Sequence, residues 1–375
     1  MKILHIIPVE KFTGSVLSLY EENIFTSDEH HFLIYLKKGD MFERNLYKSE
    51  TVFLYHTKRD CFKLLEHMSG DFDYIFLHSF FIPGFLMALL LFKKSIARKI
   101  VWIGWGFDLY EDGPKGFKHA LYNRLKKLVV NIFNAYIGIF PPDCEYFKKR
   151  FPKSKARIFY APYIGISSLV KTEYDPTYSL LKKKSNNNET IYIQIGHQAN
   201  PQLQHEYVLL KLAKFSNENI HLIIPLSYGD KENAKKVKQL AENLFGNKCT
   251  VLSDFIPRDQ YLKLLSNVDI AIFYTSRQIG LGNITSLLKK NTKIYMKKDG
   301  VMYPFYKGLC APVYDFDDID NMTFKDFIAY DEPSPAFINY VKVYYTPEKR
   351  VELWNNVYES LREALKKTNK NVNLQ

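Results

Sequence analysis

The sequence predicts an α/β protein made of two Rossmann-like domains that face a cleft, each a parallel sheet with helices on both faces. Three observations lead to this prediction. Apolar, strand-like runs alternate with helix-like segments along most of the chain, as in parallel sheets covered by helices. The alternation is interrupted at residues 167–190 and then restarts. A chain of 375 residues also exceeds what one hydrophobic core usually supports.

The domain boundaries follow from composition. Residues 167–190 contain an Asp-Pro pair, a lysine cluster and a run of asparagines, which is typical of a linker. We therefore expect domains at residues 1–166 and 191–345. Residues 346–368 open with a Thr-Pro-Glu capping sequence and continue with helical apolar periodicity. We expect this C-terminal helix to pack across both domains and to bridge back to the first.

The elements of the first domain follow in order along the chain. The predicted strands are residues 3–7, 32–35, 52–55, 74–77, 99–103 and 135–139, and the predicted helices are residues 61–69, 83–92 and 118–130. The strands are short apolar runs, whereas the helices show an apolar period of about 3.6 residues. Ligands of such sheets bind at the carboxyl ends of the strands. The residues that directly follow each strand are therefore the candidate site residues.

The second domain repeats this order of elements. Its predicted strands are residues 191–195, 220–225, 249–252, 269–274 and 292–296, and its predicted helices are residues 205–215, 231–245, 258–266 and 284–290. Asn283 or Thr285 is available as the N-cap of the last of these helices. Glycine, histidine, asparagine and tyrosine residues again follow the strands, where a ligand is expected.

A glycine-rich segment at residues 274–291 is the first candidate site. Gly280 and Gly282 interrupt the chain between a buried strand and a helix, and Arg277 lies just before them. Backbone N–H groups at the positive end of a helix dipole suit an anionic group such as a diphosphate, and an arginine adds a fixed positive charge. The alternative is that the glycines only form a tight turn between strand and helix.

The second candidate site follows two strands of the first domain. His78 ends a strand, and it is either a hydrogen-bonded structural residue or a general base, because the pKa of histidine lies near neutral pH. Within residues 104–112, Asp108 and Glu111 can act as bases or bind sugar hydroxyls, and Trp105 can pack against a sugar ring. The alternative is an aromatic-rich loop that packs under a helix and carries acids on its surface.

Two Asp-x-Asp sequences offer a metal-dependent alternative. They are Asp71-Phe72-Asp73 and Asp315-Phe316-Asp317, and paired carboxylates can bind Mn²⁺ or Mg²⁺. The first pair precedes a predicted strand, and the second follows a predicted strand as a turn and helix cap. We therefore expect no metal site.

The net charge of +12 raises three classes of partner: nucleic acid, an anionic membrane surface or a negatively charged substrate. We expect no nucleic acid, because no binding motif is present and the aromatic residues follow strand and helix periods. The four cysteines are too widely spaced to predict zinc or disulfides, which favours a cytoplasmic location. The apolar residues 80–92 are fewer than the roughly 20 needed to span a bilayer, but they can lie on its surface.

Several segments together resemble a known family. They are residues 103–111, 225–229, 244–245 and 277–282. From about residue 73 to about residue 314, the chain resembles the TDP-N-acetylfucosamine:lipid II N-acetylfucosaminyltransferases. This resemblance implies a GT-B fold and an inverting reaction. It also implies a nucleotide-activated deoxyamino sugar as donor and a polyprenyl-diphosphate-linked saccharide as acceptor, at the inner face of the cell membrane.

The resemblance also implies roles for individual residues, with the acceptor bound by the first domain and the nucleotide sugar by the second. The donor-binding residues would be Gly196, His197, Asn200, Tyr228, Asp254, Phe255, Arg277, Gln278, Gly280, Gly282, Asn283 and Thr285. The acceptor-binding residues would be Trp105, Gly106 and Tyr110. Asp108 is the preferred general base, with Glu111 and His78 behind it. Because backbone N–H groups and Arg277 would stabilise the leaving nucleotide diphosphate, no metal or other cofactor is expected.

The chain departs from the family pattern where it would face the donor. Residues 196–200 read Gly-His-Gln-Ala-Asn where the family tends to have a Gly-Asn-Ser run, and residues 283–285 read Asn-Ile-Thr where a threonine-led apolar segment is usual. The donor is therefore open, and a UDP- or GDP-sugar used in capsule, O-antigen or lipooligosaccharide synthesis is the alternative. A Rossmann protein that binds or modifies nucleotide sugars is disfavoured, because no Gly-x-Gly-x-x-Gly follows the first strand.

Overall fold

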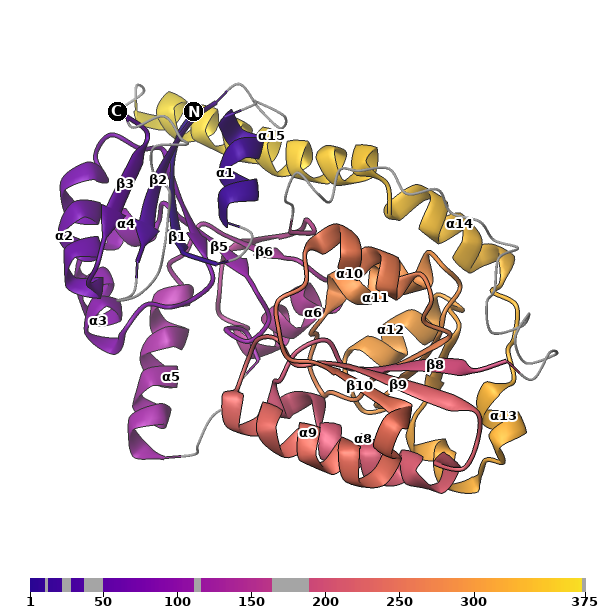
Figure 1. The fold of residues 1–375 in the computed structure, drawn as a ribbon. Coiled ribbons are helices and arrows are strands. Elements are labelled where there is room, and N and C mark those ends of the chain that lie inside the picture. The colour runs from indigo at the N-terminus through magenta and orange to yellow at the C-terminus, as the bar shows by residue number, and fades with distance from the viewer. Residues whose placement is uncertain (11–12, 22–27, 37–49, 111–115, 164–188, 373–375) are drawn as a thin grey trace. The chain divides into compact units, whose positions relative to one another are not determined.

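A computed structural model describes residues 1–10, 13–21, 28–36, 50–110, 116–163 and 189–372. The chain divides into two compact units, Met1–Lys171 with Thr346–Gln375, and Thr172–Tyr345. Each unit holds a parallel sheet flanked by helices (Figure 1), which confirms the predicted α/β class. Residues 167–188 of the predicted linker lie outside the described residues.

The sheet of the first unit has the strand order β3-β2-β1-β4-β5-β6-β7, and every neighbouring pair is parallel. Its strands are β1 (Lys2–Pro8), β2 (Glu29–Tyr35), β3 (Val52–Tyr55), β4 (Tyr74–His78), β5 (Ile100–Gly104), β6 (Ala135–Gly138) and β7 (Arg157–Tyr160). The strand order changes direction between β1 and β4. Sheets of this kind bind ligands beyond the carboxyl ends of the two strands at such a switch point.

Helices cover both faces of this sheet. They are α1 (Thr13–Glu21), α2 (Lys58–Met68), α3 (Gly84–Phe92), α4 (Lys94–Ala97), α5 (Phe117–Val130), α6 (Pro141–Arg150) and α15 (Pro347–Val372). The last helix shares one buried cluster with the sheet, in which Trp354 and Tyr358 pack with Ile3 of β1. Tyr74 donates a hydrogen bond from its hydroxyl to the carbonyl oxygen of Leu361, at 2.9 Å. The C-terminal helix is thus part of the core of the first unit.

The sheet of the second unit has the order β10-β9-β8-β11-β12-β13 and is also parallel. Its strands are β8 (Ile191–Ile195), β9 (Ile220–Pro225), β10 (Cys249–Leu252), β11 (Ile270–Phe273), β12 (Lys293–Met296) and β13 (Val313–Asp315). The order changes direction between β8 and β11, so the second switch point lies at the carboxyl ends of these two strands.

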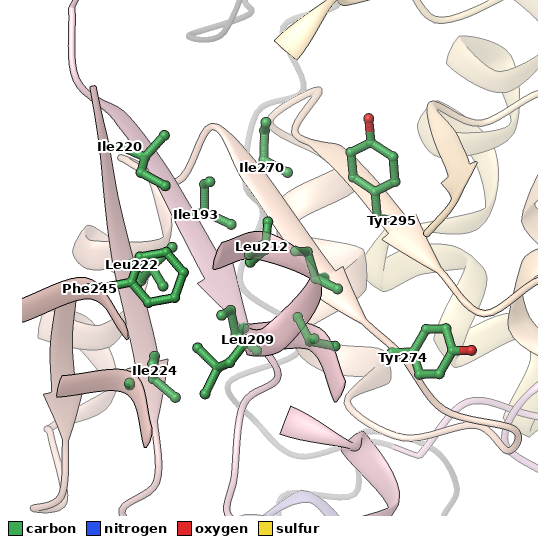
Figure 2. Packing of buried hydrophobic residues seen from close by; sticks show 14 of the residues in the cluster. Ile193, Leu209, Leu212, Ile220, Leu222, Ile224, Phe245, Ile270, Tyr274 and Tyr295 are labelled. Carbon is green, nitrogen blue, oxygen red and sulfur yellow. The ribbon is translucent and has the colours of Figure 1, made fainter. Parts of the chain in front are cut away.

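The second unit buries its apolar side chains between this sheet and its helices. The α-helices are α8 (His205–Leu212), α9 (Lys231–Phe245), α10 (Arg258–Leu265), α11 (Leu281–Leu288), α12 (Met302–Gly308), α13 (Phe324–Ile328) and α14 (Pro335–Tyr344), and the 3₁₀ turns are η3 (Pro201–Leu203), η4 (Ala213–Phe215), η5 (Gly246–Lys248) and η6 (Asp317–Asn321). Leu209 and Leu212 of α8 lie against Ile193 and Leu222 of the sheet, with Phe245 of α9 beside them (Figure 2). Full burial of each such side chain contributes about 1.5–3 kcal/mol.

Some elements differ from the sequence prediction. The unpredicted ones are α1, α4, α6, α12, α13, α14 and β7. Helix α6 opens with Pro141-Pro142, which suggests a break in the chain, yet proline is well tolerated in the first turn of a helix. Helix α11 begins at Leu281 with Gly280 as its N-cap. The prediction that Asn283 or Thr285 caps this helix was wrong, because the left-handed Gly280 starts it earlier.

Candidate active site

Two glycines bring the chain together at the switch point of the second unit. Gly196 directly follows β8 with φ +60°, and Gly280 ends the loop after β11 with φ +74°. A side chain is strained at such positive φ values. A Cβ atom on Gly280 would also lie 2.8 Å from Nδ1 of His197, which is buried. The loops after β8 and β11 therefore pack closely, and glycine is required at residue 280.

The N-terminus of α11 lies at this junction. No side chain caps the helix at Gly280, so the first N–H groups of α11 are not satisfied by an N-cap residue. Gly282 is exposed, and a Cβ atom there would meet nothing within 4 Å. Backbone donors at the positive end of a helix dipole, with an open approach, can bind an anion.

Arg277 and Gln278 are both buried just before this helix. The Nε–H group of Arg277 donates to Oε1 of Gln202, and a terminal N–H group donates to the carbonyl oxygen of Gln278 at 3.2 Å. Thr275 in turn donates from its hydroxyl to the carbonyl oxygen of Arg277, at 3.3 Å. The loop thus holds a permanently charged guanidinium near the uncapped helix end, which favours an anion further.

Backbone hydrogen bonds also join the loops that follow β8 and β9. The N–H group of Ala199 donates to the carbonyl oxygen of Tyr228 at 2.8 Å, and the N–H group of Asp230 donates to that of Ala199 at 3.1 Å. This pairing places the half-buried Tyr228 near His197, with 6.2 Å between the ring centroids. Asn200 instead caps η3, because its Oδ1 accepts from the N–H group of Gln202 at 3.0 Å. His197, Tyr228 and Gly280 are therefore brought together.

The remaining predicted donor residues are placed differently. Asp254 and Phe255 follow β10, the outermost strand, and both are exposed. Asn283 accepts a hydrogen bond at its Oδ1 from the Tyr261 hydroxyl, at 2.6 Å, and this contact joins α11 to α10. Thr285 lies inside α11. Asp254 and Phe255 therefore follow a strand that is not at the switch point, whereas Arg277, Gln278 and the glycines lie in the loops at it.

In the first unit, Asp108 is buried in the turn after β5. Its Oδ2 accepts from the N–H group of Phe80 at 2.6 Å and from Nε1 of Trp102 at 2.8 Å. Its Oδ1 accepts from the N–H group of Trp105 at 2.8 Å, and Nζ of Lys126 donates to its carbonyl oxygen. The carboxylate therefore ties the loop after β4 to the loop after β5.

Of the predicted acceptor-side residues, Trp105 is half-buried and Tyr110 is buried. The hydroxyl of Tyr110 donates to Oδ1 of Asp143 at 2.7 Å, and burial raises the pKa of Tyr110. Gly106 has φ +92°, which a residue with a side chain would rarely adopt. Glu111 lies outside the described residues. Tyr110 thus packs inward, whereas Trp105 stays at the edge of the loop.

His78 lies at the carboxyl end of β4, at the switch point of the first unit. Its Nδ1 is 3.0 Å from the hydroxyl of Tyr163, and its Nε2 is 2.9 Å from Nδ1 of His5. Burial lowers the pKa of His78 to about 3. Both ring nitrogens therefore have partners, and the imidazole is neutral at neutral pH.

The sequence prediction missed other residues at this edge. Ser79 follows β4 with φ +67°, a strained conformation that is often found at functional sites. Tyr163 contacts His78 from beyond β7, and Glu10 is an exposed carboxylate just after β1. The position of Glu10 directly after the first strand is a signal that strand-end reasoning could have used. Nothing in the local sequence marks Tyr163.

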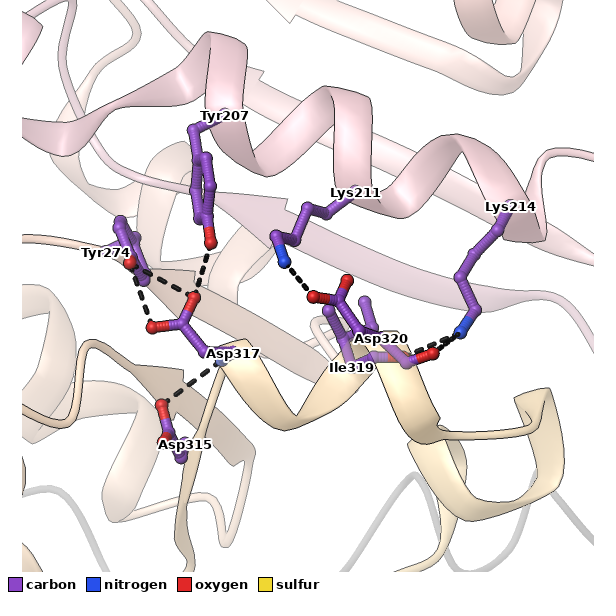
Figure 3. A network of polar contacts seen from close by, with 8 residues as sticks. All are labelled: Tyr207, Lys211, Lys214, Tyr274, Asp315, Asp317, Ile319 and Asp320. Atoms are coloured by element: carbon purple, nitrogen blue, oxygen red, sulfur yellow. Dashed lines mark hydrogen bonds and ion pairs between the residues drawn. The ribbon is translucent and has the colours of Figure 1, made fainter.

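The two Asp-x-Asp sequences have structural partners. Asp317 accepts at Oδ1 from the hydroxyl of Tyr207 at 2.6 Å, and at Oδ2 from that of Tyr274 at 3.0 Å (Figure 3). Asp73 accepts from the N–H group of Lys2 at 2.8 Å, at the amino end of β4. In the part of the chain that the structure describes, no cluster of three or more His, Cys, Asp or Glu side chains is arranged to hold a metal ion.

Comparisons with known proteins extend over nearly the whole chain. The model of a family described as 4-alpha-L-fucosyltransferase, glycosyl transferase group 56, matches residues 2–325. A sucrose-phosphate synthase from Thermosynechococcus elongatus is 11% identical with a TM-score of 0.65, covering 97% of this chain and 100% of that chain. HepE from Anabaena, in complex with UDP and glucose, is 15% identical with a TM-score of 0.63 and the same coverage.

A glycosyltransferase from Rickettsia africae ESF-5 is 13% identical with a TM-score of 0.61, covering 96% of this chain and 98% of that chain. At such identities the likeness shows the fold alone. These solved structures are GT-B glycosyltransferases, and the predicted GT-B fold is confirmed.

Proposed function

Because the chain belongs to the 4-alpha-L-fucosyltransferase family, glycosyl transferase group 56, and is a glycosyltransferase, we propose that it transfers a deoxyamino sugar from a nucleotide diphosphate. The donor would be of the TDP-N-acetylfucosamine type, and the acceptor a hydroxyl of a lipid-linked or cell-surface saccharide. The reaction would invert the anomeric centre and need no metal. The observation that carries this proposal is the uncapped N-terminus of α11 beside the buried Arg277.

The donor site would act mainly on the leaving group. As the glycosidic bond breaks, negative charge grows on the nucleotide diphosphate. The N–H groups at the start of α11 and the guanidinium of Arg277 are fixed by the fold, so they can stabilise this charge without rearranging. Each hydrogen bond to a charged group contributes about 1.5–3 kcal/mol, and a few of them do the work that a divalent cation does elsewhere.

On the acceptor side, a base must take a proton from the attacking hydroxyl. Asp108 was the preferred base, but three N–H donors already bind its carboxylate. His78 has a partner on each ring nitrogen. We therefore propose that Asp108 and His78 shape the acceptor loops. Glu10, exposed just after β1, becomes the candidate base together with Glu111.

A second donor class has one specific observation in its favour. HepE from Anabaena, whose fold this chain shares, was solved with UDP and glucose. The N-terminus of α11 and Arg277 would contact only the diphosphate of the donor. A UDP-sugar or a GDP-sugar would therefore bind to the same two groups. The TDP-, UDP- and GDP-sugar alternatives therefore differ in the nucleotide base that the site must bind, and not in the diphosphate.

We also propose that the first unit rests on an anionic membrane surface, at the cytoplasmic face, to reach a lipid-linked acceptor. Helix α3 exposes Phe85, Leu89 and Phe92, and Phe92 is 86% exposed. Helix α5, which packs against α3, exposes Phe117 and Leu121. Lysines and arginines flank this apolar patch: Lys93, Lys94, Arg98, Lys118, Arg124 and Lys127 are exposed. In the part of the structure that is described, no helix is long and apolar enough to cross a membrane.

Calorimetric titration with TDP, UDP and GDP tests the donor site without knowledge of the acceptor. We expect one of the three to bind in the absence of metal and in the presence of EDTA. Gly282→Ala places a methyl group in open space at the helix end. We expect it to weaken binding at least about tenfold while keeping or raising Tm, because alanine favours a helix over glycine by about 1 kcal/mol.

Gly280→Ala is the matched variant. It should lower Tm as well as affinity, because φ +74° and the contact with His197 exclude a side chain. Binding of none of the three diphosphates would contradict the proposed function. Undiminished binding to Gly282→Ala would place the diphosphate elsewhere.

A further inference from the structure

A glutamine in the 3₁₀ turn η3 contacts the arginine of the proposed donor site. The Nε–H group of Arg277, in the loop after β11, donates to Oε1 of Gln202, in the loop after β8. Arg277 is 8% exposed and Gln202 is half-buried. The two residues are 75 positions apart in sequence, and their loops follow the two strands at the second switch point. Gln202 is thus placed to orient the guanidinium of Arg277.

The backbone of Gln202 is held in place by its neighbours in η3. Pro201 opens the turn and has a fixed φ angle. Asn200 caps the turn, because its Oδ1 accepts from the N–H group of Gln202 at 3.0 Å. Leu203 is 1% exposed, and its Cδ1 would lie 3.1 Å from a Cβ atom on Gly196. A proline, a cap and a buried leucine therefore hold the turn against the end of β8.

A second hydrogen bond helps to set the plane of the guanidinium. A terminal N–H group of Arg277 donates to the carbonyl oxygen of Gln278 at 3.2 Å. Because a guanidinium is planar and its N–H groups form a rigid fork, bonds from two of its nitrogens restrict its rotation. The carbonyl of Gln278 belongs to the same loop as Arg277 and moves with it. Of these two bonds, the one to Gln202 relates the guanidinium to the loop after β8.

The contact is made by an amide, which suits a site for an anion. The Nε–H group of arginine is only a donor, so the atom of the Gln202 amide that faces it is the oxygen. A carboxylate could accept the same hydrogen bond, but it would add a negative charge beside the guanidinium and weaken the attraction for an anionic ligand. The amide oxygen orients the guanidinium without adding charge.

We propose that Gln202 is a positioning residue that orients the guanidinium of Arg277 toward the diphosphate of the nucleotide sugar, and that Asn200 supports it by capping η3. This inference rests on the proposed function, since it says how the same diphosphate site is organised. A charge that is already oriented stabilises a leaving group without reorganisation. Asn200, expected from the sequence to bind the donor, then acts on the donor only through Gln202 and Arg277.

Nitrogen-15 NMR of the Arg277 side chain tests the contact in the protein without ligand. We expect a resolved Nε–H resonance, which is identified by its loss in Arg277→Lys. Gln202→Met removes the acceptor at similar side-chain length and should shift or broaden this resonance. Gln204→Met is the matched control, because Gln204 is exposed two residues further on, and it should leave the resonance unchanged. A resonance that Gln202→Met also leaves unchanged would overturn the inference.

Calorimetric titration with TDP, UDP and GDP tests the consequence for the donor site. Gln202→Met should raise the Kd of the diphosphate that binds by about two- to tenfold, the effect of one ordinary hydrogen bond. In Arg277→Met, which lacks the guanidinium, Gln202→Met should have no further effect, because a positioning residue acts only through the group that it positions. Asn200→Ser keeps a capping oxygen and should preserve the affinity, whereas Asn200→Ala should weaken it.

Equal losses of affinity from Gln202→Met with and without the guanidinium would mean that Gln202 contacts the diphosphate itself, and would overturn the positioning role. Undiminished affinity in Gln202→Met would overturn it as well, while leaving the donor site intact. If Arg277→Met does not fold, Arg277→Lys takes its place in the double-mutant cycle, because lysine keeps the charge but has no Nε–H group. Failure of every nucleotide diphosphate to bind would instead contradict the proposed function, and this inference with it.

Discussion

At the scale of single residues, the carboxylates Asp108 and Glu10 occupy opposite environments. Asp108 is buried and accepts hydrogen bonds from two loops and a tryptophan, whereas Glu10 is exposed at the end of β1. A buried donor that loses its acceptor costs about 1–3 kcal/mol. A base that is removed costs a factor of about a hundred to ten thousand in rate. The two residues can therefore be separated by measuring stability and turnover together.

We expect Asp108→Asn to lower the free energy of unfolding by about 1–3 kcal/mol, because an amide group faces at least one N–H donor in place of an oxygen. Urea denaturation measures this change. Glu10→Gln should leave the unfolding midpoint unchanged and reduce kcat at least about a hundredfold. The opposite pattern, a stable Asp108→Asn with a collapsed kcat, would restore Asp108 as the base.

The sequence predicts the position of a site residue when the order of strands and helices determines it. It does not predict the position when side-chain packing determines it. The position of Gly280 and Arg277 in the loop after a strand could be predicted, because the alternation of strands and helices locates that loop. The inward turn of Tyr110 toward Asp143 depends on packing against another helix, which local sequence does not encode. The contacts of His5 with His30 and His78, each 2.9 Å between ring nitrogens, depend on the register of three strands, and no spacing in the sequence contains that register.

At the scale of elements, α3 and α5 present one apolar surface with cations around it. Helix α3 reads Gly-Phe-Leu-Met-Ala-Leu-Leu-Leu-Phe, so its outward face is as apolar as its buried face. Exposing such a face to water has no benefit for folding. In the membrane contact proposed above, acyl chains would offset that exposure, and the flanking lysines and arginines would gain about 1 kcal/mol each near an anionic surface.

We expect the double variant Phe85→Ser with Phe92→Ser to lose binding to vesicles that contain anionic lipid, in a sedimentation assay at physiological salt. Leu210→Ser is the matched control, because Leu210 is 53% exposed on α8 of the other unit. Vesicle binding that survives the double variant, or that Leu210→Ser abolishes, would contradict the proposed membrane surface.

Among the elements, the buried strands were the easiest to predict. Continuous apolar runs mark them, because a parallel sheet is covered on both faces. Strand β7 escaped detection because all its residues are only half-buried, and α6 because of its leading prolines.

At the scale of the whole molecule, buried histidines link stability to pH. Burial lowers the pKa of His30 and His205 from 6.5 to about 4, and that of His78 to about 3. The unfolded chain binds protons at these sites near pH 6.5, whereas the folded chain does so only at lower pH. Stability is therefore fully present above pH 6.5 and is lost as the pH falls toward about 4.

We expect the free energy of unfolding, measured with urea from pH 7.5 to 4.5, to fall below pH 6.5 by roughly 1 kcal/mol per pH unit for each such histidine. His30→Phe removes one of these histidines, so it should reduce the slope of the free energy against pH by up to the contribution of one bound proton. His56→Gln, at an exposed position, should leave the slope unchanged. A flat curve in this range would mean that the buried rings are protonated in the folded chain.

The two ends of the chain meet on one carboxylate. The N-terminal ammonium of Met1 lies 2.7 Å from Oδ1 of Asp28, and Arg362 of α15 lies 2.8 Å from Oδ2. The first unit is therefore discontinuous in sequence, since it needs residues 346–375, whereas the second unit is one continuous segment. During synthesis the second unit can complete its core while the first still lacks the helix that covers its sheet. The sheet of the first unit is thus synthesised well before the helix that completes its core.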